Sequence, residues 1–276
     1  MFLRRLHLAA IVGGVAAAAL GIFPTGIGTA YADDTPQPHI VGGTTATENY
    51  PFMVSLQTSK DGDPNHHICG GSLIARNWVE TNAHCVTNFD GSAKDPSLYH
   101  VRVGSNDRTT GGTVANVTGI EVYPGWDWLA DDGVDNYVGD VALLRLDRKI
   151  SSGVITVADQ TPPEGTAVRV LGWGRLNPDG SGDQPTQLQQ LDTSVLDTEV
   201  CGEDDGFGEL CAETPGSAGP CNGDSGGPAI EKADGRWVLV GSDSRGTTDL
   251  CGDGPDVFTN VTLYRSWIHA VIYNLN

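Results

Sequence analysis

The chain has 276 residues, a formal net charge of −19 at pH 7 and six cysteines. This length fits one large domain or two ordinary ones. The excess of acidic residues opposes binding to nucleic acid and to anionic membranes, because their phosphates repel a negative surface. We therefore expect neither as a partner, and we interpret the charge as that of a solvated surface.

The first 32 residues have the order of a secretory signal. Arg4 and Arg5 precede an apolar run from Leu8 to Phe23, and Ala30-Tyr31-Ala32 has the small residues of a cleavage site. The run is shorter than the ~20 residues of a spanning helix and is interrupted by glycine, which disfavours a membrane anchor. We expect residues 1–32 to be a signal peptide and the protein to be secreted and extracellular.

An even number of cysteines downstream of a signal predicts disulfides, because exported proteins meet an oxidising compartment. Six cysteines allow 15 pairings, so the count leaves the connectivity open. A zinc site is the alternative, but the sequence has no C-x-x-C pair and its histidines do not fall at zinc-ligand spacing. We expect no metal and no organic cofactor. The cysteines are Cys69, Cys85, Cys201, Cys211, Cys221 and Cys251.

The region after the signal is predicted to be mostly β-strand. Short apolar or alternating segments are separated by clusters of Gly, Pro, Asp and Asn. Such spacing is typical of an all-β sandwich or barrel. The segments are Phe52–Gln57, Ser72–Ala75, Leu98–Val103, Val141–Leu146, Ala167–Trp173, Trp237–Val240 and Val257–Val261.

A single helix is predicted at the C-terminal end. Apolar residues recur there at helical spacing, and Thr262 is placed to act as the N-cap. We expect this stripe to be a packing face. It consists of Tyr264, Trp267, Ile268, Val271 and Ile272.

The segment around Ser225 carries the strongest chemical signal. Cys221-Asn222-Gly223-Asp224-Ser225-Gly226-Gly227-Pro228 sets a serine between glycines, which suits a nucleophile on a tight turn beside N–H groups that face an oxyanion. A serine needs a base and an orienting acid. His84, in Thr81-Asn82-Ala83-His84-Cys85, offers the base, and Asp140, before an apolar strand, offers the acid. Each signal is weak alone, but all three in this order favour nucleophilic catalysis.

The same segment also matches G-x-S-x-G, the nucleophile turn of α/β-hydrolases. Those enzymes order their triad as Ser, acid, His, whereas this chain has His84, Asp140 and then Ser225. Ser225 is also not set in a strand-to-helix unit. The order favours the chymotrypsin arrangement.

The chain resembles the trypsin/chymotrypsin family over residues 40–276. The resemblance implies a chymotrypsin-like fold of two antiparallel six-stranded β-barrels with a C-terminal α-helix and an active site between the barrels. It also implies the pairings Cys69–Cys85, Cys201–Cys211 and Cys221–Cys251. Besides the segments of His84, Asp140 and Ser225, the motifs that match in family order are Ile40-Val41-Gly42-Gly43, Cys69-Gly70-Gly71-Ser72-Leu73, Gly172-Trp173-Gly174 and Ser266-Trp267-Ile268.

This resemblance implies a serine endopeptidase that hydrolyses peptide bonds through an acyl-enzyme. Ser225 is then the nucleophile, His84 its base and Asp140 the residue that orients His84, while the N–H groups of Gly223 and Ser225 form the oxyanion hole. Proteins or peptides are the expected substrates, and a monomer is the expected state. The alternative is a catalytically silent binding protein on the same fold, which the retained triad disfavours.

Residues 40–43 resemble the N-terminus that the family's zymogens expose on cleavage. Residues 33–39 are then the propeptide, and the freed ammonium of Ile40 is expected to pair with Asp224. His39 stands before the cleavage site, where the family usually has Arg or Lys. We therefore expect a separate activating protease as a partner.

The primary substrate pocket departs from that of trypsin. Gly219 stands where trypsins have Asp, and Asp256 stands where the family usually has Gly. Some crustacean collagenolytic members share this exchange and cut broadly, so we expect a non-standard pocket that permits broad cleavage. Ser244 and Gly246 are expected to line it. Arg245 replaces the family's Trp between them, which is expected to weaken preference for apolar residues upstream of the cut and to allow acidic ones.

Overall fold

The computed structural model describes residues 40–128, 139–202 and 208–273. The predicted signal peptide (1–32) and propeptide (33–39) lie outside the described residues. The described residues all fall within one compact unit, Pro36–Asn276. Among them, no helix combines the length and the apolar character needed to cross a membrane.

Six antiparallel strands of the N-terminal half form a closed barrel, in the order β2-β3-β4-β7-β6-β5. Buried and partly exposed side chains alternate along its strands, so that one face of each strand points into the core. In β5, Tyr99, Val101 and Val103 are buried, while His100 and Arg102 are partly exposed. The strands are β2 (Met53–Lys60), β3 (Asp63–Ala75), β4 (Trp78–Thr81), β5 (Tyr99–Val103), β6 (Thr113–Val122) and β7 (Ala142–Leu146).

The C-terminal half forms a second antiparallel ring, β9-β10-β11-β14-β13-β12, which closes because β9 pairs with both β10 and β12. Two short strands extend it, since β1 pairs with β10 and β8 pairs in parallel with β13. The elements are β1 (Thr44–Thr45), β8 (Thr156–Val157), β9 (Ala167–Gly172), β10 (Gln189–Leu196), β11 (Glu209–Ala212), β12 (Pro228–Ala233), β13 (Arg236–Gly246) and β14 (Asp256–Asn260).

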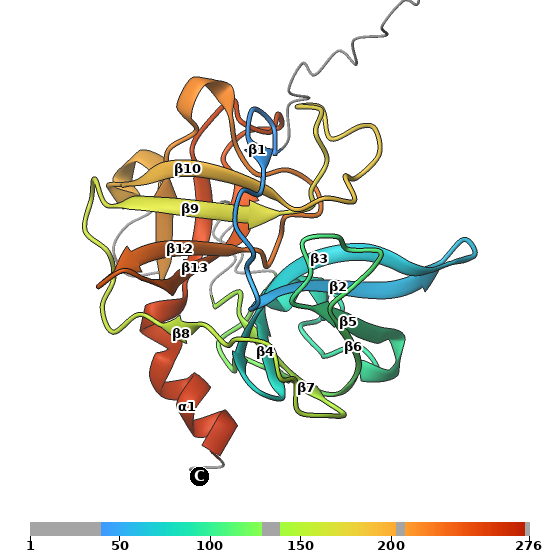
Figure 1. Ribbon diagram of the computed structural model, residues 1–276. Coiled ribbons are helices and arrows are strands. Elements are labelled where there is room, and N and C mark those ends of the chain that lie inside the picture. Colours follow the sequence, from blue (N-terminus) through green and yellow to red (C-terminus); the bar gives the residue numbers. More distant parts are fainter. Residues whose placement is uncertain (1–39, 129–138, 203–207, 274–276) are drawn as a thin grey trace, which may run out of the picture. The chain divides into compact units, whose positions relative to one another are not determined.

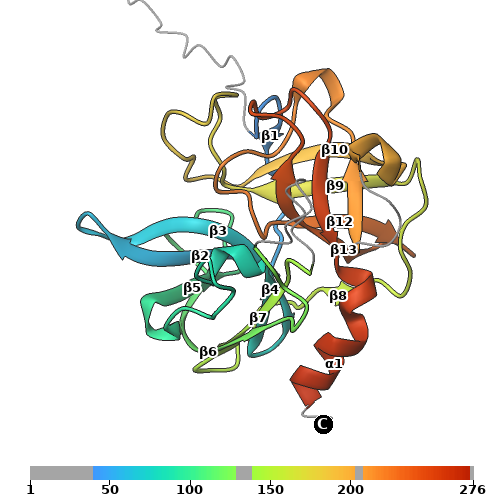
Figure 2. The same cartoon turned by 180° about the vertical axis from the view of Figure 1, so that it is seen from behind.

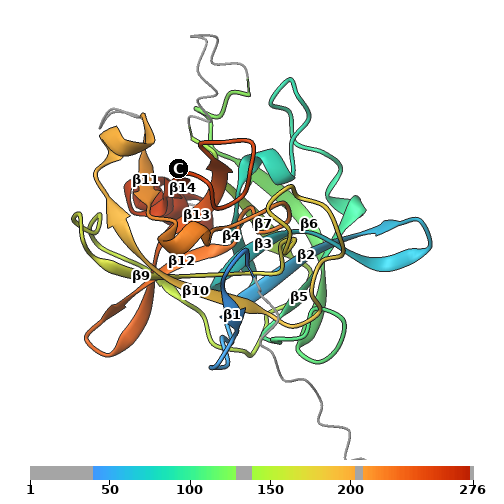
Figure 3. The same ribbon diagram turned by 90° about the horizontal axis from the view of Figure 1, so that it is seen from above.

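The predicted all-β fold of two six-stranded barrels is confirmed. Figure 1 shows strands β2–β7, in blue to green, grouped apart from strands β9, β10, β12 and β13, in yellow to red. The view from behind (Figure 2) shows β8 beside β13 and α1. The view from above (Figure 3) shows β1 beside β10. Each predicted strand segment overlaps an observed strand. The strands that were not predicted are β4 and β6 of the first barrel, β10, β11 and β12 of the second, and the short β1 and β8.

The predicted C-terminal helix is α1, Arg265–Tyr273, and its predicted apolar face packs against the core through Ile268, Trp267 and their neighbours. The N-cap prediction for Thr262 is wrong. A 3-10 turn, η5 (Val261–Tyr264), precedes the helix. Thr262 lies in that turn, and its hydroxyl donates to Oδ1 of Asn260, the residue just before the turn. Other 3-10 turns are η1 (Ala83–Cys85), η2 (Pro96–Leu98), η3 (Thr198–Cys201) and η4 (Pro215–Ser217).

The predicted disulfides are all present: Cys69–Cys85, Cys201–Cys211 and Cys221–Cys251. The first ties β3 of the first barrel to η1, and the third spans the loop that holds Ser225. Two of these links therefore brace the segments that carry the predicted catalytic residues.

Candidate active site

Ser225 lies on the turn that enters β12, and backbone hydrogen bonds from both barrels hold this turn. The Gly70 N–H of β3 donates to the Ser225 carbonyl oxygen at 2.7 Å, and the Gly226 N–H donates to the Asp243 carbonyl of β13 at 2.8 Å. Gly226 has φ +75°, and a Cβ there would overlap with Thr81 Oγ1. Glycine is thus required beside the serine on steric grounds as well as conformational ones.

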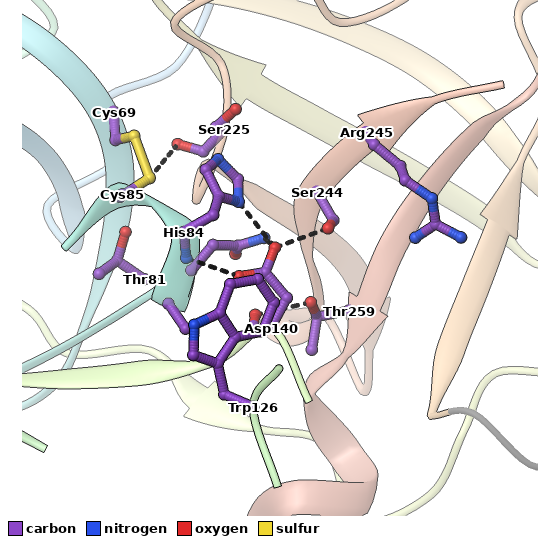
Figure 4. A network of polar contacts seen from close by, with 12 residues as sticks. Cys69, Thr81, His84, Cys85, Trp126, Asp140, Ser225, Ser244, Arg245 and Thr259 are labelled. Atoms are coloured by element: carbon purple, nitrogen blue, oxygen red, sulfur yellow. Dashed lines mark hydrogen bonds and ion pairs between the residues drawn. A yellow bond between two sulfur atoms is a disulfide. The ribbon is translucent and has the colours of Figure 1, made fainter. Parts of the chain in front are cut away.

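His84 lies in η1 and faces the carboxylate of Asp140, which precedes β7. The distance from His84 Nδ1 to Asp140 Oδ2 is 2.7 Å, and the His84 N–H donates to Asp140 Oδ1 at 2.9 Å. Figure 4 shows the His84 imidazole between the side chain of Ser225 and the carboxylate of Asp140. The structure therefore brings together the three residues that the sequence predicts as a triad.

Asp140 is fully buried, yet its carboxylate is well supplied with donors. Asn82 Nδ2 donates to Oδ2 at 2.8 Å, and the Ser244 hydroxyl donates to the same oxygen at 2.6 Å. Burial alone raises the pKa of Asp140, but the charge of His84 and the hydrogen bonds from His84 and Ser244 outweigh it. The pKa is therefore held below its ordinary value, and Asp140 is ionised at neutral pH.

A buried histidine holds the backbone between the two N–H groups of the predicted oxyanion hole. His67 Nε2 lies 2.9 Å from the Gly223 carbonyl oxygen, and His67 Nδ1 lies 2.8 Å from Ser55 Oγ. Because a carbonyl can only accept, Nε2 carries the proton and Nδ1 accepts from Ser55. Burial lowers the pKa of His67 to about 3, which keeps the ring neutral. Gly223 itself has φ +104°, in the region that favours glycine.

Asp224 is fully buried beside the Ser225 turn. Its carboxylate accepts from the Gly174 N–H at 2.6 Å and from the Cys221 N–H at 2.9 Å. Burial raises the pKa of Asp224 to about 6, although both hydrogen bonds oppose this shift. A Cβ at Gly172 or Gly174 would overlap with the carboxylate, so these glycines make room for it.

Ile40 is also fully buried, and its neighbour Val41 is hydrogen-bonded to Gly219, one of the predicted pocket residues. The Gly219 N–H donates to the Val41 carbonyl at 2.9 Å, and Ile40 packs in the same apolar cluster as Ala218. Ile40 has φ +41°. A β-branched residue at positive φ is strained, so the chain stores backbone strain at the predicted cleavage site.

A cavity of about 260 Å³ opens beside Ser225. The predicted pocket residues Ser244, Gly246 and Asp256 line it. Gly219 lies directly behind Asp256, because a Cβ at Gly219 would be 2.6 Å from Asp256 Oδ2. Asp256 therefore turns toward the pocket and fills space that a side chain at position 219 would need.

Arg245, which the sequence placed at the pocket wall as a cation, has an acidic partner. Its Nη1 donates to Glu209 Oε1, and its Nη2 donates to Glu209 Oε2 at 3.0 Å. Glu209 lies on β11, and both side chains are largely buried. Figure 4 shows the Arg245 guanidinium directed away from His84 and Asp140. This forked pair neutralises much of the charge that the sequence assigned to the wall.

The sequence did not single out three residues that contribute to the site: His67, Asn82 and Asp243. Asn82 stands two residues before His84, and only the fold shows that its amide reaches Asp140. Asp243 lies in β13 and lines the cavity beside Ser225. A charged residue shortly after the apolar Trp237–Val240 segment was the available signal for Asp243.

One cluster of the described residues has metal-ligand types close together, namely Cys69, His84 and Cys85, with ligand atoms within 4.8 Å of one another. Both sulfurs belong to the same disulfide. Because a metal binds the thiolate form of cysteine, this cluster does not make a metal site.

Comparisons with known proteins agree with this geometry. The family model described as "Trypsin" matches residues 40–268. "Trypsin alpha" from Drosophila melanogaster and its namesake from Drosophila erecta are each 32% identical over 241 residues, covering 83% of this chain and 86% of theirs. The solved structure of a human heparin binding protein superposes with a TM-score of 0.70 at 27% identity, covering 85% of this chain and 97% of that chain.

Proposed function

Because the chain belongs to the trypsin family, we propose that it is a secreted serine endopeptidase that hydrolyses peptide bonds through an acyl-enzyme. One observation carries the proposal: the 2.7 Å contact between His84 Nδ1 and Asp140 Oδ2, on the side of the ring away from Ser225. This contact places the proton of a neutral His84 on Nδ1 and leaves Nε2 unprotonated, so that it can act as a base.

The mechanism follows from these positions. Ser225 attacks the scissile carbonyl while His84 takes its proton, and His84 then passes the proton to the leaving amine. Asp140 keeps His84 in the required tautomer and stabilises the imidazolium. The N–H groups of Gly223 and Ser225 stabilise the oxyanion, each contributing about 3–4 kcal/mol to lowering the barrier. The hydrogen bond from His67 to the Gly223 carbonyl supports this arrangement by fixing the orientation of that residue.

We further propose that cleavage before Ile40 activates the protein. The buried, strained Ile40 and the buried Asp224 both support this, because the two hydrogen bonds to Asp224 come from neutral backbone N–H groups and a new ammonium would supply a cation. Cleavage also removes the preceding carbonyl, whose clash makes a positive φ costly. His39 is not a basic trypsin-type site, so a separate protease makes this cut. N-terminal sequencing of the secreted protein should read Ile-Val-Gly-Gly, and any other start contradicts this step.

The second candidate is a binding protein on the same fold, and it is raised by the structural relative that is a heparin binding protein. The net charge of −19 opposes binding of a polyanion such as heparin. Labelling by a fluorophosphonate, which reacts with activated serines, separates the two. We expect the processed chain to be labelled and the Ser225→Ala variant not to be, with kcat falling by about 10⁶. An unlabelled wild-type chain that begins at Ile40 removes the enzyme proposal.

A further inference from the structure

A fully buried acid lies where the two barrels meet. Glu80 belongs to β4 of the first barrel and is 0% exposed. In the pairing of β3 with β4, Glu80 stands opposite Ser72, so the two side chains lie on the same face of the sheet. Ser242, on β13 of the second barrel, lies close enough to Glu80 to lower the pKa of its carboxyl group. We call these three residues the Glu80 cluster.

The side-chain oxygens of the Glu80 cluster are buried together. Both carboxyl oxygens of Glu80, Ser72 Oγ and Ser242 Oγ are in hydrogen-bonding geometry with no other group of the described residues. Acids are almost never fully buried unless they are paired. A carboxyl group that carries a proton can donate to one hydroxyl and accept from another, whereas a carboxylate can only accept. The cluster therefore holds the groups of a neutral polar link between the barrels.

The surroundings of Glu80 favour its neutral form. The strand β3 presents Ser72, β13 presents Ser242, and β7 places the apolar Leu143 opposite the acid. The charged group that faces Glu80 among the described residues is the carboxylate of Asp140, which repels a second negative charge. Burial, aided by this repulsion, raises the pKa of Glu80 to about 8, although Ser242 opposes the shift. Glu80 therefore carries a proton at neutral pH.

The Glu80 cluster is connected to the triad through both barrels. On β13, Ser244 follows Ser242 by two residues, and its hydroxyl donates to Asp140 Oδ2 at 2.6 Å. In the first barrel, Asn82 follows Glu80 by two residues, and its amide donates to the same oxygen at 2.8 Å. A link between Glu80 and Ser242 therefore joins the two chain segments whose next residues hold the catalytic carboxylate.

Resting on the proposed protease function, we propose that Glu80 is a positioning residue, which as a neutral acid joins β13 to the first barrel and so keeps the Ser244 hydroxyl on Asp140. Loss of the proton reverses this effect. A buried carboxylate beside Asp140 is costly, so ionisation requires water to reach the interface between β4 and β13. The strand that carries Ser244 then separates from Asp140, and the catalytic carboxylate loses one of its donors.

This role makes catalysis depend on the proton of Glu80. With a pKa of about 8, Glu80 is neutral at pH 6.5, and about one molecule in ten keeps the proton at pH 9. The freed α-amino group of Ile40 and the carboxyl group of Asp256 also titrate in this range. The contribution of Glu80 is therefore measured as the ratio of a Glu80 variant to the wild type, in which the other two groups cancel.

The direct test uses Glu80→Gln, whose amide offers a donor and an acceptor at every pH. The kcat/KM of the variant and of the wild type, both processed to begin at Ile40, is measured from pH 6.5 to pH 9. The ratio of variant to wild type should rise about three- to tenfold, the effect of one hydrogen bond. The matched control is Glu164→Gln, the same chemical change at an exposed position before β9, whose ratio should stay constant. A ratio for Glu80→Gln that is equally constant overturns the proposal.

A second variant separates positioning from the filling of space. Glu80→Leu occupies the site without hydrogen-bonding groups, so kcat/KM at pH 6.5 should be about three- to tenfold lower than in Glu80→Gln. Ser242→Ala removes the partner on the second barrel and should lower kcat/KM by a similar factor. Equal activity of Glu80→Leu and Glu80→Gln at pH 6.5 would show that Glu80 only fills space, and it removes the proposal. Folding of each variant is checked by its near-UV circular dichroism.

Infrared spectroscopy tests the proton itself and needs no activity. At pH 6.5 the Ser225→Ala chain should show the C=O stretching band of a protonated carboxylic acid that is missing after Glu80→Gln, while the other buried acids cancel in the difference. Identical spectra would show that Glu80 is ionised, which overturns the proposal. If fluorophosphonate labels Ser225 but the activity ratio is constant with pH, the inference fails and the protease stands. If the band is present but labelling fails, the protease proposal fails and the neutral Glu80 stands.

Discussion

The triad and the pocket each contain a buried aspartate, but the pKa values of these two aspartates are shifted in opposite directions. Asp140 is fully buried and accepts hydrogen bonds from His84, Asn82 and Ser244, and its pKa is lowered. Asp256 is also buried, has an oxygen without a donor among the described residues, and has its pKa raised to about 8. Burial alone therefore does not decide the charge of a carboxyl group; the donors around it do.

This difference separates two uses of an acid. The charge of Asp140 is satisfied by the protein itself, so it serves to orient His84. Asp243 and Asp256 each have a buried oxygen without a donor among the described residues, and their raised pKa values favour the protonated form. Asp224 lies between these cases, because two backbone donors only partly offset its burial and its pKa is raised to about 6.

The largest expected effect comes from breaking the satisfied acid. In Asp140→Asn the amide no longer accepts the Nδ1 proton as a carboxylate does, so His84 adopts the wrong tautomer. We expect kcat to fall by about 10⁴ while the fold is kept. Steady-state kinetics on a peptide ester or amide measures this. A fall of less than tenfold would mean that Asp140 does not orient the base.

The next effect is on stability and is expected from the unsatisfied acid. The folded-state pKa of Asp256 is about 8, above the ~3.9 of an unfolded Asp, so the folded protein binds the extra proton and loses stability as pH rises between these values. The slope is about 1.4 kcal/mol per pH unit. Asp256→Asn removes this pH dependence. The free energy of unfolding of the variant should therefore increase relative to that of its parent as the pH rises toward 8.

Urea unfolding of the Ser225→Ala protein with and without Asp256→Asn, from pH 6.5 to 9, measures this gain. Glu80 has a pKa raised to about 8 by burial and titrates in the same window, but it is present in both proteins and cancels in the difference. His67, with a pKa of about 3, acts only at lower pH. Parallel curves for the two proteins would show that Asp256 is ionised in the fold at neutral pH.

The sequence predicted features that short motifs encode. Ser225, His84 and Asp140 each lie in a recognisable segment. The order of these segments matches the family, and this resemblance also predicted the two barrels and the disulfide pairings. Asp243 could not be placed in this way. Its contact with the cavity depends on the pairing of β13 with β14, where the register shifts between Asp243 and Arg245. A shift in register breaks the alternation of faces that a sequence pattern relies on.

Partners distant in the sequence were hidden for the same reason. Glu209 pairs with Arg245 from β11, and His67 reaches Gly223 across 156 positions. The first pair joins two strands of the second barrel, and the second pair joins the first barrel to the loop before β12, so both depend on the tertiary fold. Thr262 illustrates a local limit. It lies in a 3-10 turn before the helix begins, and its hydroxyl donates to Asn260 rather than to an N–H group of the helix.

A smaller effect tests how many donors Asp140 needs. Asn82→Ala removes one hydrogen bond to Oδ2 but leaves those from His84 and Ser244. We expect kcat/KM to fall about three- to tenfold, near the ~1 kcal/mol of a single hydrogen bond. Ser244→Ala removes the hydroxyl donor to the same oxygen and is the matched comparison. If Asn82→Ala matches Asp140→Asn instead, Asn82 acts on more than the position of the carboxylate.

The smallest expected effect concerns the one cation at the pocket wall among the described lining residues. Glu209→Gln keeps the shape of the side chain but removes the charge that pairs with Arg245. The charge of Arg245 at the cavity beside Ser225 is then less neutralised. Substrates with acidic residues upstream of the cut should be cleaved faster, and those with basic residues more slowly. A contact between Arg245 and a solvent-exposed acidic side chain of the substrate contributes about 1 kcal/mol or less, so the change in relative kcat/KM should be about threefold. Peptide-library profiles of the two proteins measure it. Identical profiles would show that Arg245 does not act on substrate even without this acidic partner.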